Sequence, residues 1–237
     1  MKNTAIILSG GTGTRLNSTV PKQYIEVSGK PIICFCLEKF QACSLIDDII
    51  IVADENYFEM LDRVLKTHNI SKFKTFASAG ITRQHSIYNA LLQINSLPKN
   101  TCSDAENENF IIVHDSARPL VTENDIESLV SALKTSTEKF DGITPVLPVK
   151  DTVYVCEDGE IVSLLKRDTI FAGQTPEIYK FEKYLSAHEG VNLSEIRGSS
   201  EIAIKAGMKI GTCNGNENNF KITTTNDLNK FKTTLCI

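Results

Sequence analysis

A glycine-rich loop follows the first apolar run of the chain. Residues 5–8 are all apolar, and Ser9-Gly10-Gly11-Thr12-Gly13-Thr14-Arg15 comes directly after them. A loop that closes a buried strand directs several backbone N–H groups towards one point, where they bind anions. Arg15 and Lys22 add two cations near that point. The segment therefore predicts a site for the phosphates of a nucleoside triphosphate.

Two better-known phosphate-binding motifs do not fit this loop. A Walker loop needs Gly, four residues and then Gly-Lys-Ser/Thr, and the chain has no such run. The dinucleotide fingerprint needs a third glycine where this chain has Leu16. The run Gly-Gly-x-Gly-Thr-Arg-Leu, with Pro21-Lys22 shortly after it, is instead typical of nucleotidyltransferases that activate sugars and polyols. The alternative is a glycine-rich turn without a ligand, which three glycines and two cations together disfavour.

A second polar run, His114-Asp115-Ser116-Ala117-Arg118-Pro119, follows the apolar residues 110–113. In a parallel sheet this order puts Asp115 at the same edge as the glycine loop. A carboxylate there could hold Mg²⁺ against phosphates, because Mg²⁺ prefers oxygen ligands and commonly takes one or two carboxylates. The alternative is an aspartate that caps the turn and pairs with Arg118. His114 is a candidate general base, although packing in the core or the turn is favoured.

Lys221 lies in a third polar segment, Asn219-Phe220-Lys221-Ile222-Thr223. We expect this segment to be a short strand that returns to the edge of the sheet. Without the other motifs, Lys221 would be interpreted as a solvated lysine, which is the commonest state of that residue.

Apolar runs alternate with helical patterns over the first two-thirds of the chain. Strands are predicted at residues 5–8, 48–52, 73–77, 110–113 and 143–147. The segments between them have apolar residues at helical spacing, and Thr122 is expected to cap one of these helices. This alternation predicts an α/β fold with a mostly parallel sheet covered by helices on both faces. Ligands of such sheets bind beyond the carboxyl ends of the strands.

The alternation stops at Asp151, where a hairpin pattern begins. Residues 152–156 and 161–165 are predicted strands, and Asp158-Gly159 between them suits a tight reversal. An isolated hairpin buries too little apolar surface to be stable alone. We therefore expect residues 151–170 to form an arm that packs on a second copy of the chain; the alternative is a hairpin folded back on its own domain. Helices near residues 181–187 and 201–206, a strand at 209–213 and a helix after Thr225 complete the predicted order.

Composition limits the class of protein and its partners. With 237 residues, 41% of them hydrophobic, the chain is long enough for one α/β domain with a buried core. The net charge of -4 argues against nucleic acid as the main partner, and no apolar run is long enough to span a membrane. Seven cysteines without a CxxC pair indicate reduced thiols. We therefore expect a cytoplasmic protein.

The motifs resemble, in their order along the chain, those of the 2-C-methyl-D-erythritol 4-phosphate cytidylyltransferases and of close relatives that activate D-ribitol 5-phosphate. The matching blocks are Gly10–Arg15 with Pro21-Lys22-Gln23-Tyr24, Gly80-x-x-Arg83-x-x-Ser86-Ile87, His114–Pro119, Asp151-Thr152, Arg167, Gln174-Thr175-Pro176 and Asn219-Phe220-Lys221. The resemblance implies a Rossmann-like nucleotidyltransferase fold in one domain, residues 1–237. It also implies a mostly parallel twisted sheet, helices on both faces and a protruding β-hairpin arm for dimerisation.

The resemblance also implies a role for each candidate site residue. Arg15 and Lys22 would bind the triphosphate, Lys221 would reach the transferring phosphoryl group, and Asp115 would bind Mg²⁺ or another divalent cation. Thr152 and Arg167 would come from the arm of a partner subunit to hold the polyol phosphate in a homodimer. The expected contacts to the cytosine and ribose of CTP come from Leu8, Ser9, Gly10, Gly11, Gly13, Gly80, Ser86 and Ser116.

The implied reaction transfers CMP from CTP to a short polyol phosphate with release of pyrophosphate. Methylerythritol phosphate, an isoprenoid precursor, is the favoured acceptor, because residues 113–119 resemble that branch of the family more closely. D-ribitol 5-phosphate, for CDP-ribitol in cell-surface polymers, is the alternative. A hexose-1-phosphate nucleotidyltransferase and a catalytically silent interaction protein of the same fold are more distant alternatives.

The chain departs from the family pattern at several positions. Arg197-Gly198-Ser199-Ser200-Glu201 stands where many relatives have a Thr-Asp-Asp or Ser-Asp segment, so the acidic contact there is missing or displaced to Glu201. Glu177 replaces the usual Gln after Thr-Pro, Tyr154 replaces a Lys, and Ile81 replaces an often acidic residue. These departures are compatible with an acceptor other than methylerythritol phosphate.

Overall fold

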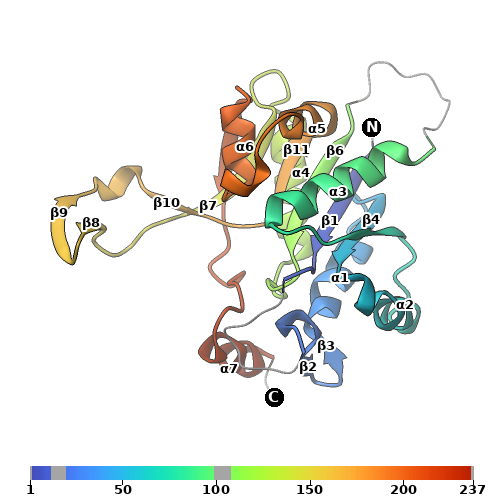
Figure 1. Cartoon of the computed structure of the whole chain (residues 1–237). Coiled ribbons are helices and arrows are strands. Elements are labelled where there is room, and N and C mark those ends of the chain that lie inside the picture. Colours follow the sequence, from blue (N-terminus) through green and yellow to red (C-terminus); the bar gives the residue numbers. More distant parts are fainter. Residues whose placement is uncertain (1, 12–19, 99–107, 236–237) are drawn as a thin grey trace.

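The structure, a computed structural model, describes residues 2–11, 20–98 and 108–235 (Figure 1). Its centre is an eight-stranded sheet in the order β10-β7-β11-β6-β1-β4-β5, with β12 paired to β7. The strands are β1 Asn3–Leu8, β2 Glu26–Val27, β3 Lys30–Pro31, β4 Asp48–Ala53, β5 Phe73–Ser78, β6 Phe110–Asp115, β7 Gly142–Pro148, β8 Tyr154–Glu157, β9 Glu160–Leu164, β10 Phe171–Gly173, β11 Glu177–Lys180 and β12 Ile210–Asn214. The five strands predicted before the hairpin are confirmed as β1, β4, β5, β6 and β7.

Most of the sheet is parallel, as predicted. β1 pairs in parallel with β4 and β6, β4 with β5, and β12 with β7. The antiparallel members are β10 and β11, and β11 lies in the middle of the sheet between β6 and β7. β11 is not among the strands predicted from the sequence. Its four residues, Glu177-Ile178-Tyr179-Lys180, are all buried. Because charged residues stand at both ends, the sequence pattern did not indicate a buried strand.

Helices cover both faces of the sheet, as the alternation of apolar runs predicts (Figure 1). Ala5 and Ile7 of β1 belong to a core with α1, α2 and α4, whereas Ile6 belongs to the opposite core with α3, α5 and α6. Successive strand residues point to opposite faces, so one apolar strand contributes to both cores. The helices are α1 Ile32–Ala42, α2 Phe58–Thr67, α3 Arg83–Ser96, α4 Glu123–Lys134, α5 Phe181–His188, α6 Ser199–Lys205 and α7 Thr225–Thr234.

Capping residues begin several of these helices. Thr122 caps α4, as predicted, in a reciprocal capping box with Asp125. Thr224 and Asp227 form the same box at α7, and the Thr82 side chain caps α3. The cap at Thr82 fixes the first turn of α3 beside the loop that follows β5. The cap therefore also places Arg83, the first residue of α3, beside that loop.

The predicted hairpin is confirmed and extends away from the body of the protein (Figure 1). β8 and β9 pair only with each other, and Asp158 and Gly159 both have positive φ at the turn. Six of the eleven large apolar side chains that are exposed in the described ranges lie between Tyr154 and Phe171. The hairpin is therefore not folded back on its own domain.

One predicted element is wrong. Residues 219–223 form no strand, and Lys221 lies in the loop between β12 and α7. The segment still reaches the sheet edge, because the Ile222 N–H donates to the Ala117 carbonyl oxygen at 2.8 Å and the Ile222 side chain is fully buried. In the part of the chain that the structure describes, no helix has the length and apolar character needed to cross a membrane.

Candidate functional site

A cavity of about 380 Å³ lies at the carboxyl ends of β1 and β6. It is bordered by the glycine loop after β1, the loop after β5, the start of α3 and the segment that contains Lys221. Ten of the candidate site residues line it: Leu8, Ser9, Gly10, Gly11, Lys22, Gly80, Ser86, Asp115, Ser116 and Lys221. Gly13 and Arg15 lie outside the described residues. The structure therefore brings together candidates that are far apart in the sequence, such as Lys22 and Lys221.

Two of the glycines lie where a side chain has no room. A Cβ at Gly10 would come within 2.4 Å of the Ala79 Cβ, and a Cβ at Gly80 would come within 2.3 Å of the His85 Cβ. The loops after β1 and β5 therefore approach each other closely at the cavity. The Gly80 N–H donates to the Ser86 hydroxyl at 3.0 Å, which fixes the second loop to α3.

The short helix Lys22–Tyr24 holds the glycine loop from behind. The Gln23 side-chain amide donates to the carbonyl oxygens of Ser9 and Gly11 at 2.6 and 2.9 Å. The Tyr24 hydroxyl contacts the Ser9 hydroxyl at 2.9 Å, and Ser116 donates from its hydroxyl to the Leu8 carbonyl oxygen at 2.7 Å. These bonds use carbonyl oxygens of the loop and not its backbone N–H groups. The N–H groups are the ones that bind phosphate in loops of this kind.

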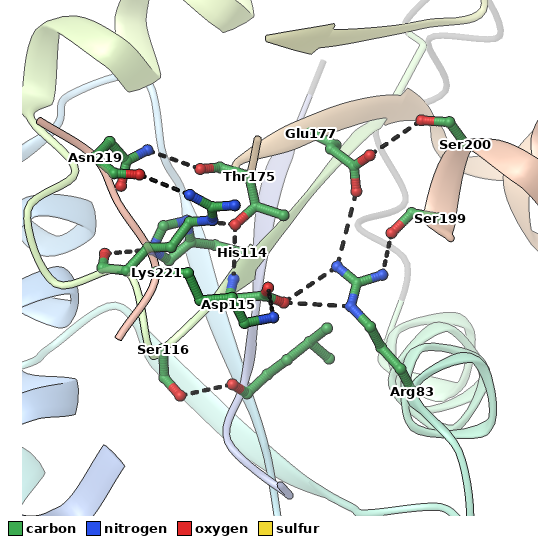
Figure 2. A network of polar contacts seen from close by, with 12 residues as sticks. Arg83, His114, Asp115, Ser116, Thr175, Glu177, Ser199, Ser200, Asn219 and Lys221 are labelled. Atoms are coloured by element: carbon green, nitrogen blue, oxygen red, sulfur yellow. Dashed lines mark hydrogen bonds and ion pairs between the residues drawn. The ribbon is translucent and has the colours of Figure 1, made fainter. Parts of the chain in front are cut away.

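Asp115 lies between two cations at the cavity wall (Figure 2). Its Oδ2 accepts from the Lys221 ammonium at 2.6 Å, and its Oδ1 accepts from Nε and Nη2 of Arg83 at 3.3 and 3.2 Å. Burial alone would raise the pKa of Asp115, but Arg83 and Lys221 outweigh it and lower the pKa well below the ordinary value. Asp115 is therefore an ionised carboxylate at the cavity, and its ion-pair partners are Arg83 and Lys221 and not Arg118, which was the alternative considered from the sequence.

Arg118 instead donates to a backbone carbonyl. Its Nη1 lies 2.7 Å from the carbonyl oxygen of Asn219. The Asn219 side chain donates in turn to the Thr175 carbonyl oxygen at 2.8 Å, and the Thr175 hydroxyl accepts from the Asp115 N–H at 3.1 Å. These bonds attach the segment before Lys221 to the end of β6, so the Lys221 ammonium is directed to Asp115.

Arg83 is the functional residue that the sequence analysis left without a role. Its guanidinium binds Asp115 on one side and, on the other, the Ser199 hydroxyl through Nη1 and the Glu177 carboxylate at 3.8 Å through Nη2 (Figure 2). Burial raises the pKa of Glu177, and Arg83 opposes that rise. Ser200 donates to the same carboxylate at 3.0 Å. The sequence signal for Arg83 was its place in the block Gly80-x-x-Arg83.

Glu201 does not supply the displaced acidic contact considered from the sequence. Its carboxylate pairs with Lys205 on the next turn of α6 at 2.8 Å and does not line the cavity. The carboxylate that contacts this region is Glu177 on β11, which accepts from the Ser200 hydroxyl and lies behind the cavity against Arg83.

His114 is a core residue, which the sequence analysis favoured over a general base. Its side chain is fully buried, Nε2 lies 3.1 Å from the Arg118 carbonyl oxygen, and the ring packs on Phe40. Burial lowers the pKa of His114 to about 4. The imidazole is therefore neutral near pH 7 and has no access to the cavity, which it does not line.

The buried histidines predict how stability depends on pH. Burial lowers the pKa of both His114 and His188 from 6.5 to about 4, so the unfolded chain binds more protons than the folded chain between these values. Between pH 7 and pH 5 the free energy of unfolding should therefore fall by about 2 kcal/mol for each histidine. Urea unfolding at the two pH values measures this fall. His188→Phe keeps an aromatic ring beside Tyr184 and should reduce the fall by about 2 kcal/mol; an unchanged fall would contradict the assignment.

Thr152 and Arg167 do not reach the cavity of their own chain. Both are exposed on the arm, and the Arg167 guanidinium donates to the Lys150 carbonyl oxygen at 3.1 Å. Neither residue lines the cavity. A role at the site therefore requires the arm of a second copy.

The donor set at Asp115 fits a cation that is shared with phosphates. Oδ1 accepts two bonds from Arg83 and Oδ2 accepts one from Lys221, so one of about four lone-pair positions of the carboxylate is left. Among the described residues no cluster of three or more His, Cys, Asp or Glu side chains could hold a metal ion by itself. The chemistry suits Mg²⁺, which takes one carboxylate plus substrate phosphates.

Comparisons with known proteins identify the family of this chain. The family model described as IspD: 2-C-methyl-D-erythritol 4-phosphate cytidylyltransferase matches residues 3–235. A 2-C-methyl-D-erythritol 4-phosphate cytidylyltransferase from Clostridium acetobutylicum is 32% identical over 98% of this chain and 97% of its own length. A bifunctional IspD/IspF enzyme from Wolbachia pipientis is 30% identical over 98% of this chain, which spans only 55% of that relative.

A solved structure shows the same fold. The 4-diphosphocytidyl-2C-methyl-D-erythritol synthase from Anaerococcus prevotii superposes with a TM-score of 0.80 at 23% identity, over 100% of this chain and 96% of the other. The match over residues 3–235 and the relatives show that this chain belongs to the 2-C-methyl-D-erythritol 4-phosphate cytidylyltransferase (IspD) family.

Proposed function

We propose that this protein transfers CMP from CTP to 2-C-methyl-D-erythritol 4-phosphate and releases pyrophosphate. The observation that best supports the proposal is the convergence of Lys22, Lys221 and Asp115 on a cavity bordered by the glycine loop. The volume of about 380 Å³ is within the range of small-molecule sites. The family model and the named relatives favour methylerythritol phosphate over D-ribitol 5-phosphate as acceptor.

The nucleotide half of the cavity consists mainly of backbone. In the proposal, the loop residues 8–11 with Gly80, Ser86 and Ser116 hold the base and ribose, and Lys22 binds the triphosphate. Lys22 lies at the base of the glycine loop and its ammonium donates to the Ile222 carbonyl oxygen at 2.8 Å. The ammonium groups of Lys22 and Lys221 are thereby held at the same edge of the sheet.

The reaction requires stabilisation of charge more than proton transfer. A phosphate oxygen of the acceptor attacks the α-phosphorus of CTP, and the bond from this phosphorus to the bridging oxygen of the β-phosphate breaks as pyrophosphate leaves. The acceptor phosphate is already anionic near neutral pH, so no general base is needed. Lys22 and Lys221 supply fixed positive charge where negative charge accumulates. This role is consistent with the burial of His114 away from the cavity.

Asp115 is the residue proposed to hold a divalent cation, with phosphate oxygens as the remaining ligands. When bound, such an ion would neutralise phosphate charge and orient the triphosphate. The residues of the chain position the carboxylate for this purpose, because Lys221 and Arg83 hold its two oxygens from opposite sides.

The arm suggests a homodimer in which each subunit completes the site of the other. It presents exposed apolar side chains, among them Ile161 at 64% and Leu164 at 63% of full exposure, and an isolated apolar hairpin needs a surface to cover it. In the proposal the partner's arm brings Thr152 and Arg167 to the acceptor phosphate. A cytoplasmic location remains a prediction from the sequence.

Leu164→Asp should convert the dimer to a monomer. The side chain is exposed in the single chain, so the change costs the monomer little, but it places a charge in an apolar interface. Sedimentation should show the loss of dimer, and KM for the acceptor should rise at least tenfold because Thr152 and Arg167 are withdrawn. Ile204→Asp is the control: Ile204 is 62% exposed on α6, outside the arm, and its change should leave the dimer intact. A dimeric Leu164→Asp protein would contradict the arrangement.

The function itself is tested by offering the purified protein CTP and Mg²⁺ with each acceptor while pyrophosphate is measured. Release is expected with 2-C-methyl-D-erythritol 4-phosphate and not with D-ribitol 5-phosphate. Release with D-ribitol 5-phosphate alone would reassign the acceptor. A preference for UTP or dTTP would indicate a hexose-1-phosphate enzyme, and absence of CTP binding in calorimetry would indicate a catalytically silent relative.

A further inference from the structure

We propose that Glu177, together with Ser199, is a positioning element for the transfer reaction: it fixes the guanidinium of Arg83, which in turn fixes the Asp115 carboxylate. The inference rests on the proposed function, because it assigns a task to residues behind the same cavity. Arg83 and Asp115 line the cavity, whereas Glu177 and Ser199 do not.

The guanidinium of Arg83 is held on two sides by groups from distant parts of the chain (Figure 2). On the cavity side, Nε and Nη2 donate to the same oxygen of Asp115 at 3.3 and 3.2 Å. On the far side, Nη1 contacts the Ser199 hydroxyl and Nη2 lies 3.8 Å from Glu177. A planar, rigid guanidinium that is bound on both sides has a fixed orientation, so it presents its donors to Asp115 in one geometry.

Glu177 is itself attached to the rigid part of the fold. Glu177 is only 7% exposed and lies on β11, inside the sheet. Its Oε1 accepts a hydrogen bond from the Ser200 hydroxyl at 3.0 Å. The Ser200 hydroxyl also lies 2.9 Å from the Thr144 hydroxyl on β7 and 3.0 Å from the Tyr179 hydroxyl on β11. The orientation of Arg83 is thus set by the sheet and by α6.

Charge balance explains why a carboxylate is needed at this place. Asp115 is shared between the positive charges of Arg83 and Lys221, and Glu177 places a second negative charge beside Arg83. Without Glu177, the guanidinium of Arg83 loses its anionic contact on the far side, and Asp115 alone faces both Arg83 and Lys221. A catalytic carboxylate that is loosely held loses part of its effect, because transition-state stabilisation depends on preorganised charge.

The structure supplies a way to restore the missing charge. The Ser199 hydroxyl contacts Nη1 of Arg83 directly, so Ser199→Asp would place a carboxylate against the same guanidinium from α6. Glu177→Gln keeps the size of the side chain and an oxygen that can accept from Ser200, and removes only the charge. The combination Glu177→Gln/Ser199→Asp therefore moves the negative charge from the strand to the helix.

The test compares wild type, Glu177→Gln and the double variant for CTP affinity by calorimetry, for kcat by pyrophosphate release and for thermal unfolding. Glu177→Gln should bind CTP within about threefold of wild type, because Glu177 is not a cavity residue, and should lose at least tenfold in kcat. The double variant should recover most of that loss. Glu201→Gln is the matched control: its carboxylate pairs with Lys205 on the surface of α6, so kcat should stay unchanged.

Each other outcome is informative. An unchanged kcat in Glu177→Gln, or a loss that Ser199→Asp does not recover, overturns the inference. So does a Glu177→Gln protein that fails to fold and is not rescued by Ser199→Asp, because the role would then lie in folding. A wild-type protein that binds CTP but releases no pyrophosphate with either acceptor contradicts the proposed function instead.

Discussion

Lys22→Ala is expected to lower kcat by about a hundredfold or more while the protein stays folded. Removal of one preorganised charge that faces the reacting phosphates costs about 3 kcal/mol of transition-state stabilisation. The folded state also loses the hydrogen bond from the Lys22 ammonium to the Ile222 carbonyl oxygen, and a bond of this kind contributes about 1 kcal/mol. The kinetic effect should thus exceed the effect on the free energy of unfolding.

A second lysine provides a close control for this variant. Lys72 also donates from its ammonium to a backbone carbonyl oxygen, that of Cys43, at 2.6 Å, but it lies outside the cavity. Lys72→Ala should cost a similar free energy of unfolding and leave kcat unchanged. Pyrophosphate release and urea unfolding of the two variants separate the effects. A Lys22→Ala protein with the turnover of wild type would refute the phosphate-binding role.

The strands that border the site could be predicted because their signals are local. β1, β4 and β6 each contain an unbroken run of at least four apolar residues, and all of their residues but Leu8 are buried in the sheet. The glycine loop and Asp115 follow such runs directly, so the rule that ligands bind at the carboxyl ends of parallel strands places them together. For the same reason, the hairpin could be predicted from Asp158-Gly159 between two apolar strands.

The polar network behind the site could not be predicted in this way. Arg83 forms ion pairs with Asp115 and Glu177, which are tens of residues away in the sequence. Contacts between residues so far apart leave no periodic pattern of apolar and polar residues from which they could be predicted. β11 was missed for a related reason: Glu177 and Lys180 read as surface residues, yet each is buried with an ion-pair partner. The prediction of a strand at Lys221 was wrong because Ile222 packs in a small core with α7 and does not pair in the sheet.

Asp115→Asn should affect both catalysis and stability, unlike Lys22→Ala. The carboxylate is buried and has ion-pair contacts with Arg83 and Lys221, and removal of one partner from a buried pair costs about 3 kcal/mol or more. Because these cations lower the pKa of Asp115, the stabilisation is present above its ordinary pKa near 3.8 and is lost only as the pH falls further. The difference in unfolding free energy between wild type and variant should therefore be constant from pH 8 to pH 5 and shrink in stronger acid.

The comparison with Asp141→Asn separates the two effects of the Asp115 change. Asp141 is also a buried carboxylate with two lysine partners, Lys183 at 2.6 Å and Lys180 at 3.6 Å, but it precedes β7 at the opposite end of the sheet. Both variants should lose stability in urea unfolding, and only Asp115→Asn should lose about a hundredfold or more in kcat, as expected when preorganised charge at the phosphates is disturbed. Equal kcat values in the two variants would mean that Asp115 contributes to stability alone. That result would contradict the proposed role of the Asp115 carboxylate in the transfer reaction.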